Sequence, residues 1–208
     1  MTIRQFTSDA VFRQRYWARN HLGWRHMDRT QPNAGHRALA ALERAGVVCG
    51  LITQNVDLLH SKAGSDKVID LHGTYARVIC LDCAFTMTRA ALADLLDEAN
   101  PGFAERAAAV GGIAVAPDAD AVVADTASFR VVDCPRCGGM LKPDIVYFGE
   151  SVPKDRVDEA YSLVDAADAL LVAGSSLTVY SGYRFVRHAA AAAMPVARTS
   201  WVGRRVIA

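Results

Sequence analysis

The sequence has almost no net charge and contains few lysines. Its 23 Lys and Arg residues are balanced by 22 Asp and Glu residues, which leaves a formal net charge of +1. Most of the basic residues are arginines, and lysine occurs only at positions 62, 67, 142 and 154. Because a basic surface is the usual signature of nucleic-acid binding, this composition predicts that nucleic acid is not the main partner.

Long apolar runs are also missing. The run HAAAAAMPVA at 188–197 is well short of the roughly 20 residues that a membrane-spanning helix needs, so we expect no membrane partner. The N-terminal segment contains Arg and Ser, as transit peptides do, but Asp9 and the apolar spacing favour an ordinary amphipathic helix. Since 51% of the residues are hydrophobic, we expect a folded cytoplasmic protein with one domain, or one domain that carries a smaller insert.

Cysteine is scarce, and four of the five cysteines form two Cys-x-x-Cys pairs, Cys80/Cys83 and Cys134/Cys137. This spacing does not resemble the disulfide framework of a secreted domain. The fifth, Cys49, lies in the apolar run GVVCGLIT, and we expect it to be a buried small hydrophobic residue.

Two Cys-x-x-Cys turns can supply the four thiolates of a tetrahedral zinc site. In CPRCGG, Pro135 and the following glycines favour the tight turn that lets amide N–H groups face the sulfurs. The loop between the pairs can be long, because the entropy of loop closure rises slowly with length. The alternative is a redox or disulfide centre, which usually lies at a helix N-terminus after a strand, and neither pair fits that pattern cleanly. A closed site with four cysteines would be structural, since it leaves no open coordination position.

The rest of the chain alternates between helical periodicity and short apolar runs. We expect helices over 7–20, 36–46, 155–168 and 183–193, and strands over 47–55, 169–177 and 194–199. The continuous apolar character of 47–55 is typical of a strand covered on both faces, as in a parallel sheet. The pattern predicts an α/β fold with a Rossmann-like parallel sheet.

Residues 78–143 interrupt this alternation. They contain both cysteine pairs, a helical segment at 89–99 and a loose Gly-, Ala- and Asp-rich stretch at 110–130 that we expect to be an extended excursion. We therefore expect a zinc-binding module at 78–143, inserted into a Rossmann-like domain formed by 1–77 and 144–208.

Two polar segments follow the predicted strands. Thr53, Gln54, Asn55 and Asp57 come directly after the first strand, at the strand end where doubly wound sheets bind ligands. Gly-Ser-Ser at 174–176 follows a later strand and precedes a helix, a geometry that binds phosphate but is a weak signal alone. A lone His72 would ordinarily be read as a packed histidine, but here it stands between the first polar cluster and the first cysteine pair.

Together these segments resemble the sirtuins, the NAD-dependent protein-lysine deacylases. The matching segments are TQNVD, LHG, the paired Cys-x-x-Cys turns, KPDIVYFGE and GSSLTVYSG, and their order and separations also fit. The sequence around TQNVDLLHSKAG is most similar to the class II branch of the family. The resemblance extends over about residues 1–197.

The resemblance implies a reaction and a role for each matching position. His72 would be the general base that activates a ribose hydroxyl of NAD, and the products would be nicotinamide, free lysine and an O-acyl-ADP-ribose. The NAD-binding residues would be Gln54, Asn55, Val56, Asp57, Gly174, Ser175 and Ser176. The substrate-binding residues would be Val146, Phe148, Gly149, Glu150 and Val179. The Zn²⁺ ligands would be Cys80, Cys83, Cys134 and Cys137. The partner would be an acylated-lysine protein that pairs backbone to backbone with the substrate segments.

The sequence departs from the family pattern at both ends. The Gly-rich strand and loop with which the family begins is not found, and after MPVA at 194–197 the sequence reads RTSWVGRRVIA. We therefore expect a Rossmann-like sheet that is truncated relative to the family. The alternative function is a catalytically impaired sirtuin remnant that acts as a zinc-stabilised binding module. Two further readings are ADP-ribosyl transfer and, more remotely, a zinc-ribbon interaction module with unrelated flanks.

Overall fold

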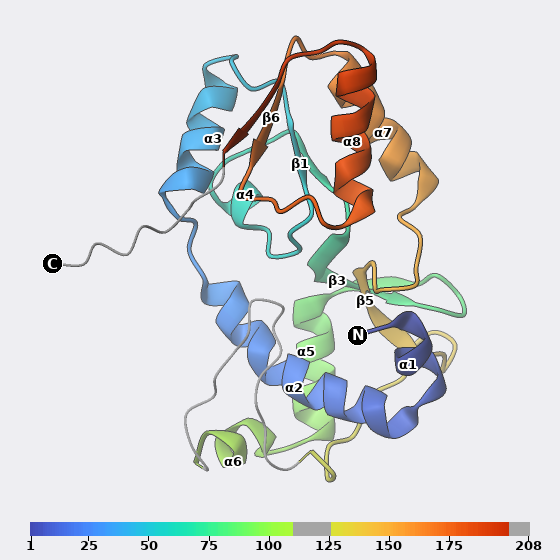
Figure 1. Cartoon of the computed structure of the whole chain (residues 1–208). Coiled ribbons are helices and arrows are strands. Elements are labelled where there is room, and N and C mark those ends of the chain that lie inside the picture. The colour runs from blue at the N-terminus through green and yellow to red at the C-terminus, as the bar shows by residue number, and fades with distance from the viewer. Residues whose placement is uncertain (110–125, 200–208) are drawn as a thin grey trace, which may run out of the picture.

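The computed structural model describes residues 1–109 and 126–199. Two groups of elements lie one above the other in Figure 1. The lower group contains α1 (Ile3–Ser8), α2 (Ala10–Arg29), α5 (Arg89–Ala99), α6 (Phe103–Ala109), β3 (Gly73–Cys80), β4 (Thr86–Thr88) and β5 (Leu141–Ile145). The upper group contains α3 (Ala34–Arg44), α4 (Leu59–Lys62), α7 (Lys154–Asp165), α8 (Tyr180–Ala191), β1 (Leu51–Thr53), β2 (Val68–Asp70), β6 (Leu170–Ala173) and β7 (Val196–Thr199).

The predicted excursion at 110–130 and the departure from the family pattern at the C-terminus fall largely outside the described residues, which omit 110–125 and 200–208. Within the described part of the chain, none of the helices combines the length and the hydrophobicity needed to cross a membrane.

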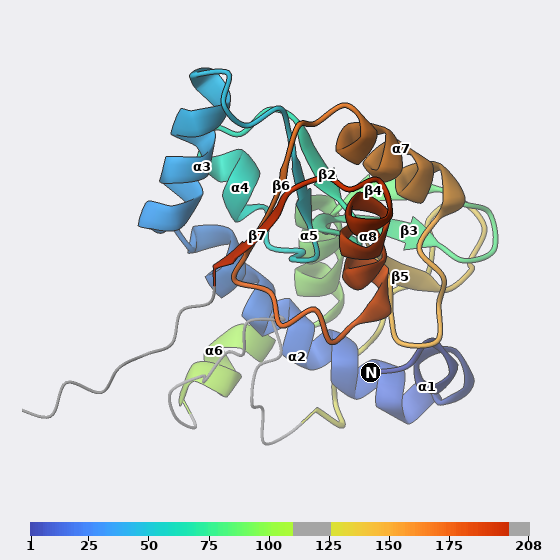
Figure 2. The same ribbon diagram turned by 45° about the horizontal axis from the view of Figure 1, so that its top comes forward.

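The upper group contains the predicted parallel strands. β1 pairs with β2 in parallel, and β6 pairs with β7 in parallel, as two separate two-stranded sheets (Figure 2). Helices α7 and α8 pack against them through a small core that includes Leu71, Ala160, Val164 and Phe185. The alternation of helix and strand in the sequence therefore predicted the type of sheet correctly.

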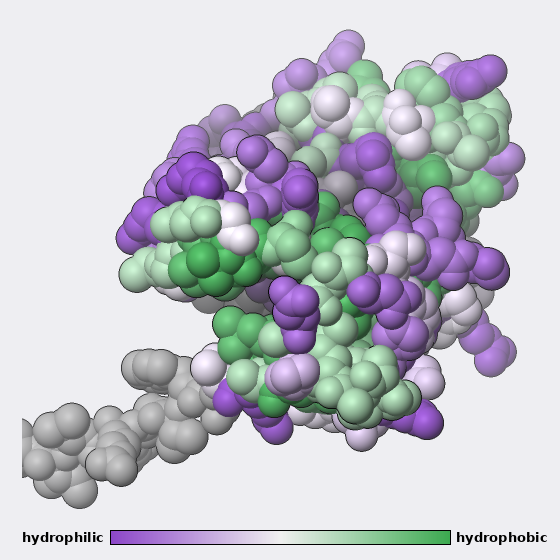
Figure 3. Space-filling view, turned by 90° about the horizontal axis from the view of Figure 1, so that it is seen from above, coloured by the Kyte–Doolittle hydropathy of each residue, from purple (hydrophilic) through white to green (hydrophobic). Residues whose placement is uncertain are grey.

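The prediction of a strand covered on both faces over 47–55 is wrong. Within this segment, β1 contains only three residues, and Val47 is 71% exposed. The later strand β7 is open as well, since each of its residues is exposed. The reason is that each of the two described sheets in the upper group has only two strands, so many of their apolar side chains keep one open side. Seen from above in Figure 3, hydrophobic surface (green) lies among hydrophilic surface (purple). The predicted burial of Cys49 is also wrong, because Cys49 is exposed in the irregular connection between α3 and β1.

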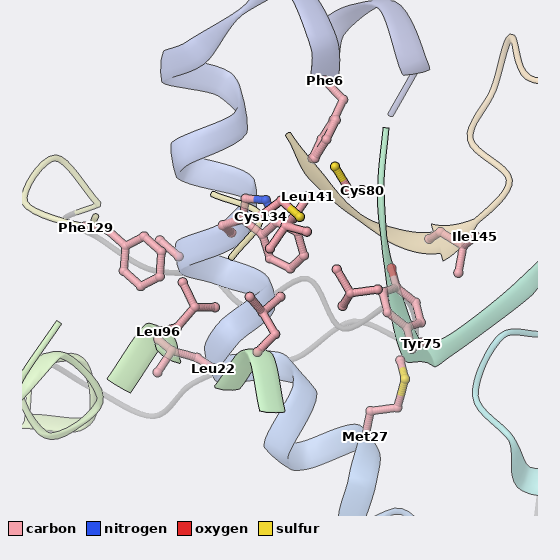
Figure 4. Close-up of a cluster of buried hydrophobic side chains, with 14 of the residues drawn as sticks. Phe6, Leu22, Met27, Tyr75, Cys80, Leu96, Phe129, Cys134, Leu141 and Ile145 are labelled. Atoms are coloured by element: carbon pink, nitrogen blue, oxygen red, sulfur yellow. The ribbon is translucent and has the colours of Figure 1, made fainter. Parts of the chain in front are cut away.

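The lower group holds the larger hydrophobic core, part of which is drawn in Figure 4. The predicted helix over 7–20 is two helices, since Asp9 ends α1 and its side chain caps α2 by accepting from the Phe12 amide. Phe6 and Trp17 from these helices are buried in the same core as Cys80 and Cys134. The division into domains stays a prediction, and the packing adds that α1 and α2 lie against the cysteine-bearing part of the chain.

The junction of the two groups depends on Gly73. It begins β3, which pairs antiparallel with β5 and carries an irregularity between Gly73 and Val78. Gly73 has a φ of +81°, and a Cβ atom there would lie 2.0 Å from the carbonyl oxygen of Asp144. Only glycine allows this close approach of the two strands, and the turn fixes His72 directly before β3.

Candidate functional site

The four paired cysteines converge on one point. Their sulfur atoms all lie within 4.8 Å of one another, with 3.6 Å between Cys80 and Cys137 and 3.8 Å between Cys83 and Cys134. A tetrahedral zinc ion with Zn–S bonds of about 2.3 Å requires sulfurs about 3.8 Å apart. The donor set and its spacing therefore fit Zn²⁺, with no position left for a substrate.

Hydrogen bonds from the backbone hold the two cysteine turns together, and one of them has a side-chain acceptor. The Leu81 amide donates to the Met140 carbonyl at 2.9 Å, and the Met140 amide donates to the Asp82 carboxylate at 2.9 Å. Within the second turn, the Cys134 amide donates to the Gly139 carbonyl at 2.8 Å. These bonds tie the end of β3 to the segment before β5, which is how residues far apart in sequence build one site.

A second candidate site is a cavity of about 1150 Å³ between the upper and lower groups. Several predicted site residues line it: Gln54, Val56, His72, Val146, Phe148, Gly149, Glu150 and Val179. Asn55, Asp57, Gly174, Ser175 and Ser176 do not line this cavity. The predicted substrate residues thus come together around His72, whereas the predicted NAD residues divide between the cavity and its surroundings.

Two groups hydrogen-bond the imidazole of His72. Its Nε2 atom lies 2.7 Å from the Ser181 hydroxyl, and the backbone of Gln54 hydrogen-bonds the imidazole as well. Burial lowers the pKa of His72, and the positive charge of Arg156 lowers it further, while the bond to Gln54 opposes the shift. A neutral imidazole has one ring nitrogen without a proton and can accept a proton there, as a general base must.

The loop between β6 and α8 approaches the Gln54 side chain. Ser175 Oγ donates to Gln54 Oε1 at 3.4 Å, and the Leu177 amide donates to Ser175 Oγ at 3.2 Å. Gly174 has a φ of +66°, and a Cβ atom there would meet no atom within 4 Å, so the backbone borders open space. The N-cap of α8, Val179, gives no side-chain hydrogen bond, which leaves backbone donors at this helix start.

The first polar cluster is only partly aimed at the cavity. Gln54 lines it, but the Asp57 carboxylate accepts from the Leu59 amide at 3.0 Å. Asn55 is exposed, and its amide donates to the Thr53 hydroxyl at 3.1 Å.

The predicted substrate segment is anchored at both ends. The Val146 amide donates to the His72 carbonyl at 2.8 Å, which ties the segment to the candidate base. The Phe148 side chain is 68% exposed, but its amide and carbonyl are bonded to Met1 and Ile3. Backbone pairing with a substrate therefore has to use positions other than Phe148.

Sequence reasoning missed residues of the cavity that come from helices. Ser181 and Arg184 line it from α8, and Arg15 lines it from α2. The VYSG part of GSSLTVYSG was the available signal for Ser181, because it continues a recognised motif into the helix start. Arg15 belongs to no motif in the sequence, and its place in the cavity wall depends on how α2 packs.

Comparison with known proteins decides the family. A family model described as Sir2 family matches residues 1–181. The chain belongs to the Sir2 family. Among similar proteins is NAD-dependent protein deacetylase 1 of Mycobacterium avium strain 104, 77% identical over 197 residues, which cover 95% of this chain and 70% of the relative. NAD-dependent protein deacetylase 1 of Streptomyces coelicolor is 54% identical over 198 residues, with 94% and 64% covered. This Sir2-family chain thus spans about two thirds of the length of these curated relatives.

Solved structures of Sir2 proteins share the fold. The structure of Sir2Tm bound to a propionylated peptide matches with a TM-score of 0.74 at 27% identity, covering 98% of this chain and 72% of that one. A complex of Sir2 with a p53 peptide and NAD⁺ matches with a TM-score of 0.71 at 28% identity, covering 95% and 68%. The predicted Rossmann-like α/β fold is therefore confirmed for this Sir2-family chain.

Proposed function

We propose that the chain is an NAD-dependent protein-lysine deacylase that acts in the cytoplasm on acylated-lysine proteins. The observation that carries this proposal is the half-buried His72, which lines the same cavity as the predicted substrate segment. The names of the similar relatives, both NAD-dependent protein deacetylases, support the same reaction.

NAD fits the residues around the loop between β6 and α8. The backbone beside Gly174 borders open space, the hydroxyls of Ser175 and Ser176 lie in the same loop, and the start of α8 lacks a side-chain cap. Backbone donors at a helix start favour anionic groups such as a pyrophosphate. When bound, NAD would supply the ribose carbon to be attacked and nicotinamide as the leaving group.

Each proposed residue has one task in this reaction. His72 would accept at Nε2 the proton of the substrate hydroxyl, which is a ribose hydroxyl of NAD, because burial favours its neutral form. The proposed cofactor-binding residues are Gln54, Asn55, Val56, Asp57, Gly174, Ser175 and Ser176. The proposed acyl-lysine channel consists of Val146, Phe148, Gly149, Glu150 and Val179. The proposed zinc ligands Cys80, Cys83, Cys134 and Cys137 would stabilise the lower group without taking part in the chemistry.

The alternative is a zinc-stabilised binding module without cofactor chemistry. It is favoured by the separate core of the lower group, which contains Cys80 and Cys134, and by the open faces of β6 and β7. Calorimetric titration with NAD distinguishes the two functions, because only the enzyme binds it.

Nicotinamide release from NAD, measured with acetylated and propionylated lysine peptides, tests the proposal. His72→Ala should lower the steady-state rate of nicotinamide release by roughly 100-fold or more, since removal of a general base typically has that effect. His26→Ala, at an exposed position of α2, is the matched control and should keep the wild-type rate. A folded, zinc-loaded wild-type chain that releases no nicotinamide would overturn the enzyme proposal.

A further inference from the structure

Ser181 lies at the centre of a hydrogen-bonded chain that joins the loop before α8 to the candidate base. Its hydroxyl is 2.7 Å from His72 Nε2, and the side-chain amide of Gln54 donates to the same oxygen at 3.4 Å. The other end of the Gln54 side chain accepts from Ser175 at 3.4 Å. The chain of contacts therefore runs from Ser175 through Gln54 and Ser181 to His72.

These contacts determine which nitrogen of His72 carries the proton. The bond between the imidazole and the backbone of Gln54 raises the pKa of His72, so the carbonyl accepts and the ring donates. Because Nε2 faces Ser181, the donating nitrogen is Nδ1. Nε2 then has only a lone pair, and the Ser181 hydroxyl must donate to it. The Gln54 amide supports this direction, since it donates to Ser181 and leaves the hydroxyl proton for His72.

The residue after Ser181 is shaped to permit the chain of contacts. A Cβ atom at Gly182 would lie 2.7 Å from the Gln54 side-chain amide nitrogen. A side chain at this position would push the end of the Gln54 side chain away, so glycine leaves the space in which Gln54 reaches Ser181. Two adjacent positions, one without a side chain and one with a hydroxyl, thus serve the same contact.

We propose that Ser181 is a positioning residue for His72: it holds the imidazole in the tautomer that has the lone pair at Nε2, and it couples that ring to Gln54. The proposal rests on the proposed function, in which His72 accepts a proton at Nε2. Before the substrate hydroxyl arrives, the Ser181 hydroxyl donates a hydrogen bond to the lone pair of His72 Nε2. When the substrate hydroxyl binds, it replaces Ser181 as the hydrogen-bond donor to Nε2. Ser181 is not a catalytic residue, since it acts through His72.

A direct physical consequence follows for the titration of His72. A hydroxyl that donates to Nε2 stabilises the neutral ring and opposes its protonation. We expect the charged groups that act on His72 to stay unchanged when Ser181 is altered. They are Arg156, whose charge lowers the pKa of His72, and Arg15, Arg19, Arg184 and Glu150, which line the cavity. Loss of the Ser181 hydroxyl should therefore raise the pKa of His72, although the surrounding charge is unchanged.

The test is an NMR titration of the full zinc-loaded chain without NAD, with the His72 signals identified by their loss in His72→Gln. Ser181→Ala should raise the His72 pKa by about half a unit to one unit, the shift equivalent to one ordinary hydrogen bond. Nitrogen shifts should report Nδ1–H in the wild type and a mixture of tautomers in Ser181→Ala. Ser181→Thr keeps a hydroxyl and should restore both properties.

The matched control is Ser162→Ala, which removes a hydroxyl bonded to the Asp158 carbonyl within α7 and should leave His72 unchanged. An unshifted His72 pKa and an unchanged tautomer in folded Ser181→Ala would overturn the proposal. Because this titration needs no turnover, it gives an answer even if the chain releases no nicotinamide. If the wild type is active, the acidic limb of its rate profile should move to higher pH in Ser181→Ala by the same shift.

Discussion

The ammonium group of Lys142 lies 3.0 Å from the carboxylate Oε2 of Glu150, although Lys142 is almost completely buried. Lys142 also donates to the Ile145 carbonyl and lies 4.5 Å from the centre of the Tyr147 ring. The same oxygen of Glu150 accepts from the Tyr147 amide at 2.7 Å. The pair therefore closes the turn at 145–150, which lines the cavity beside His72.

Glu150→Ala should lower the free energy of unfolding by about 1–3 kcal/mol, because it leaves the buried ammonium of Lys142 without its counter-charge. The figure is below that of a fully buried pair, since the Glu150 side chain is 24% exposed and is partly screened by water. Urea unfolding measures the loss. Asp158→Ala is the control, because its pair with Lys154 is exposed and should contribute nothing measurable. Equal losses in the two variants would contradict the assigned role of the buried pair.

The cysteine cluster predicts one zinc ion per chain. Cys134→Ser should reduce bound zinc to near zero and lower the melting temperature, because the buried sulfur belongs to both the site and the larger core. Metal analysis and thermal melting measure the two effects. Cys49→Ser is the matched control, since this exposed cysteine lies outside the cluster and should leave one zinc bound. Full zinc occupancy in Cys134→Ser would rule out the four-cysteine site.

The sequence predicted the parts of the site that are encoded locally. The Cys-x-x-Cys spacing and the polar residues after the first strand are short-range patterns, and the structure brings the cysteines together and places Gln54 beside His72 through Ser181. Other features depend on long-range packing. Ser181 reaches His72 across 109 positions of the chain, and no local pattern states which helix start meets which strand end. The prediction that Cys49 is buried was wrong for the same reason. An apolar run shows that a segment can be covered, but the number of neighbouring strands decides whether it is covered.

Acid should destabilise the fold through His21. Burial lowers the pKa of His21 and the charge of Arg89 lowers it further, while Asp97 opposes the shift. A histidine with a lowered pKa in the folded state binds its proton more readily when unfolded. Its contribution is thus complete above about pH 6.5 and is lost as the pH falls towards the folded pKa, with a slope of at most about 1.4 kcal/mol per pH unit.

Urea unfolding at several pH values measures this slope, and zinc content is followed at each pH so that metal loss is not mistaken for it. His21→Gln should flatten the dependence. His26→Gln, an exposed histidine on the same helix, should leave it unchanged. An identical slope in wild type and His21→Gln would show that other groups cause the acid sensitivity.

Gly73→Ala should be the most damaging of the conservative substitutions, because it combines two costs. Its φ of +81° is unfavourable for alanine by about 1–2 kcal/mol, and its Cβ would also lie 2.0 Å from the Asp144 carbonyl oxygen. The strands β3 and β5 must then separate beside His72, so we expect a total loss of more than about 3 kcal/mol and a lower affinity for acylated peptide. Gly46→Ala isolates the first cost, since Gly46 has a φ of +73° and open space around its Cβ position. It should lose only about 1–2 kcal/mol in urea unfolding and keep wild-type peptide binding. If the two alanine variants unfold at the same urea concentration, the close approach of the strands at Gly73 is not what fixes the junction.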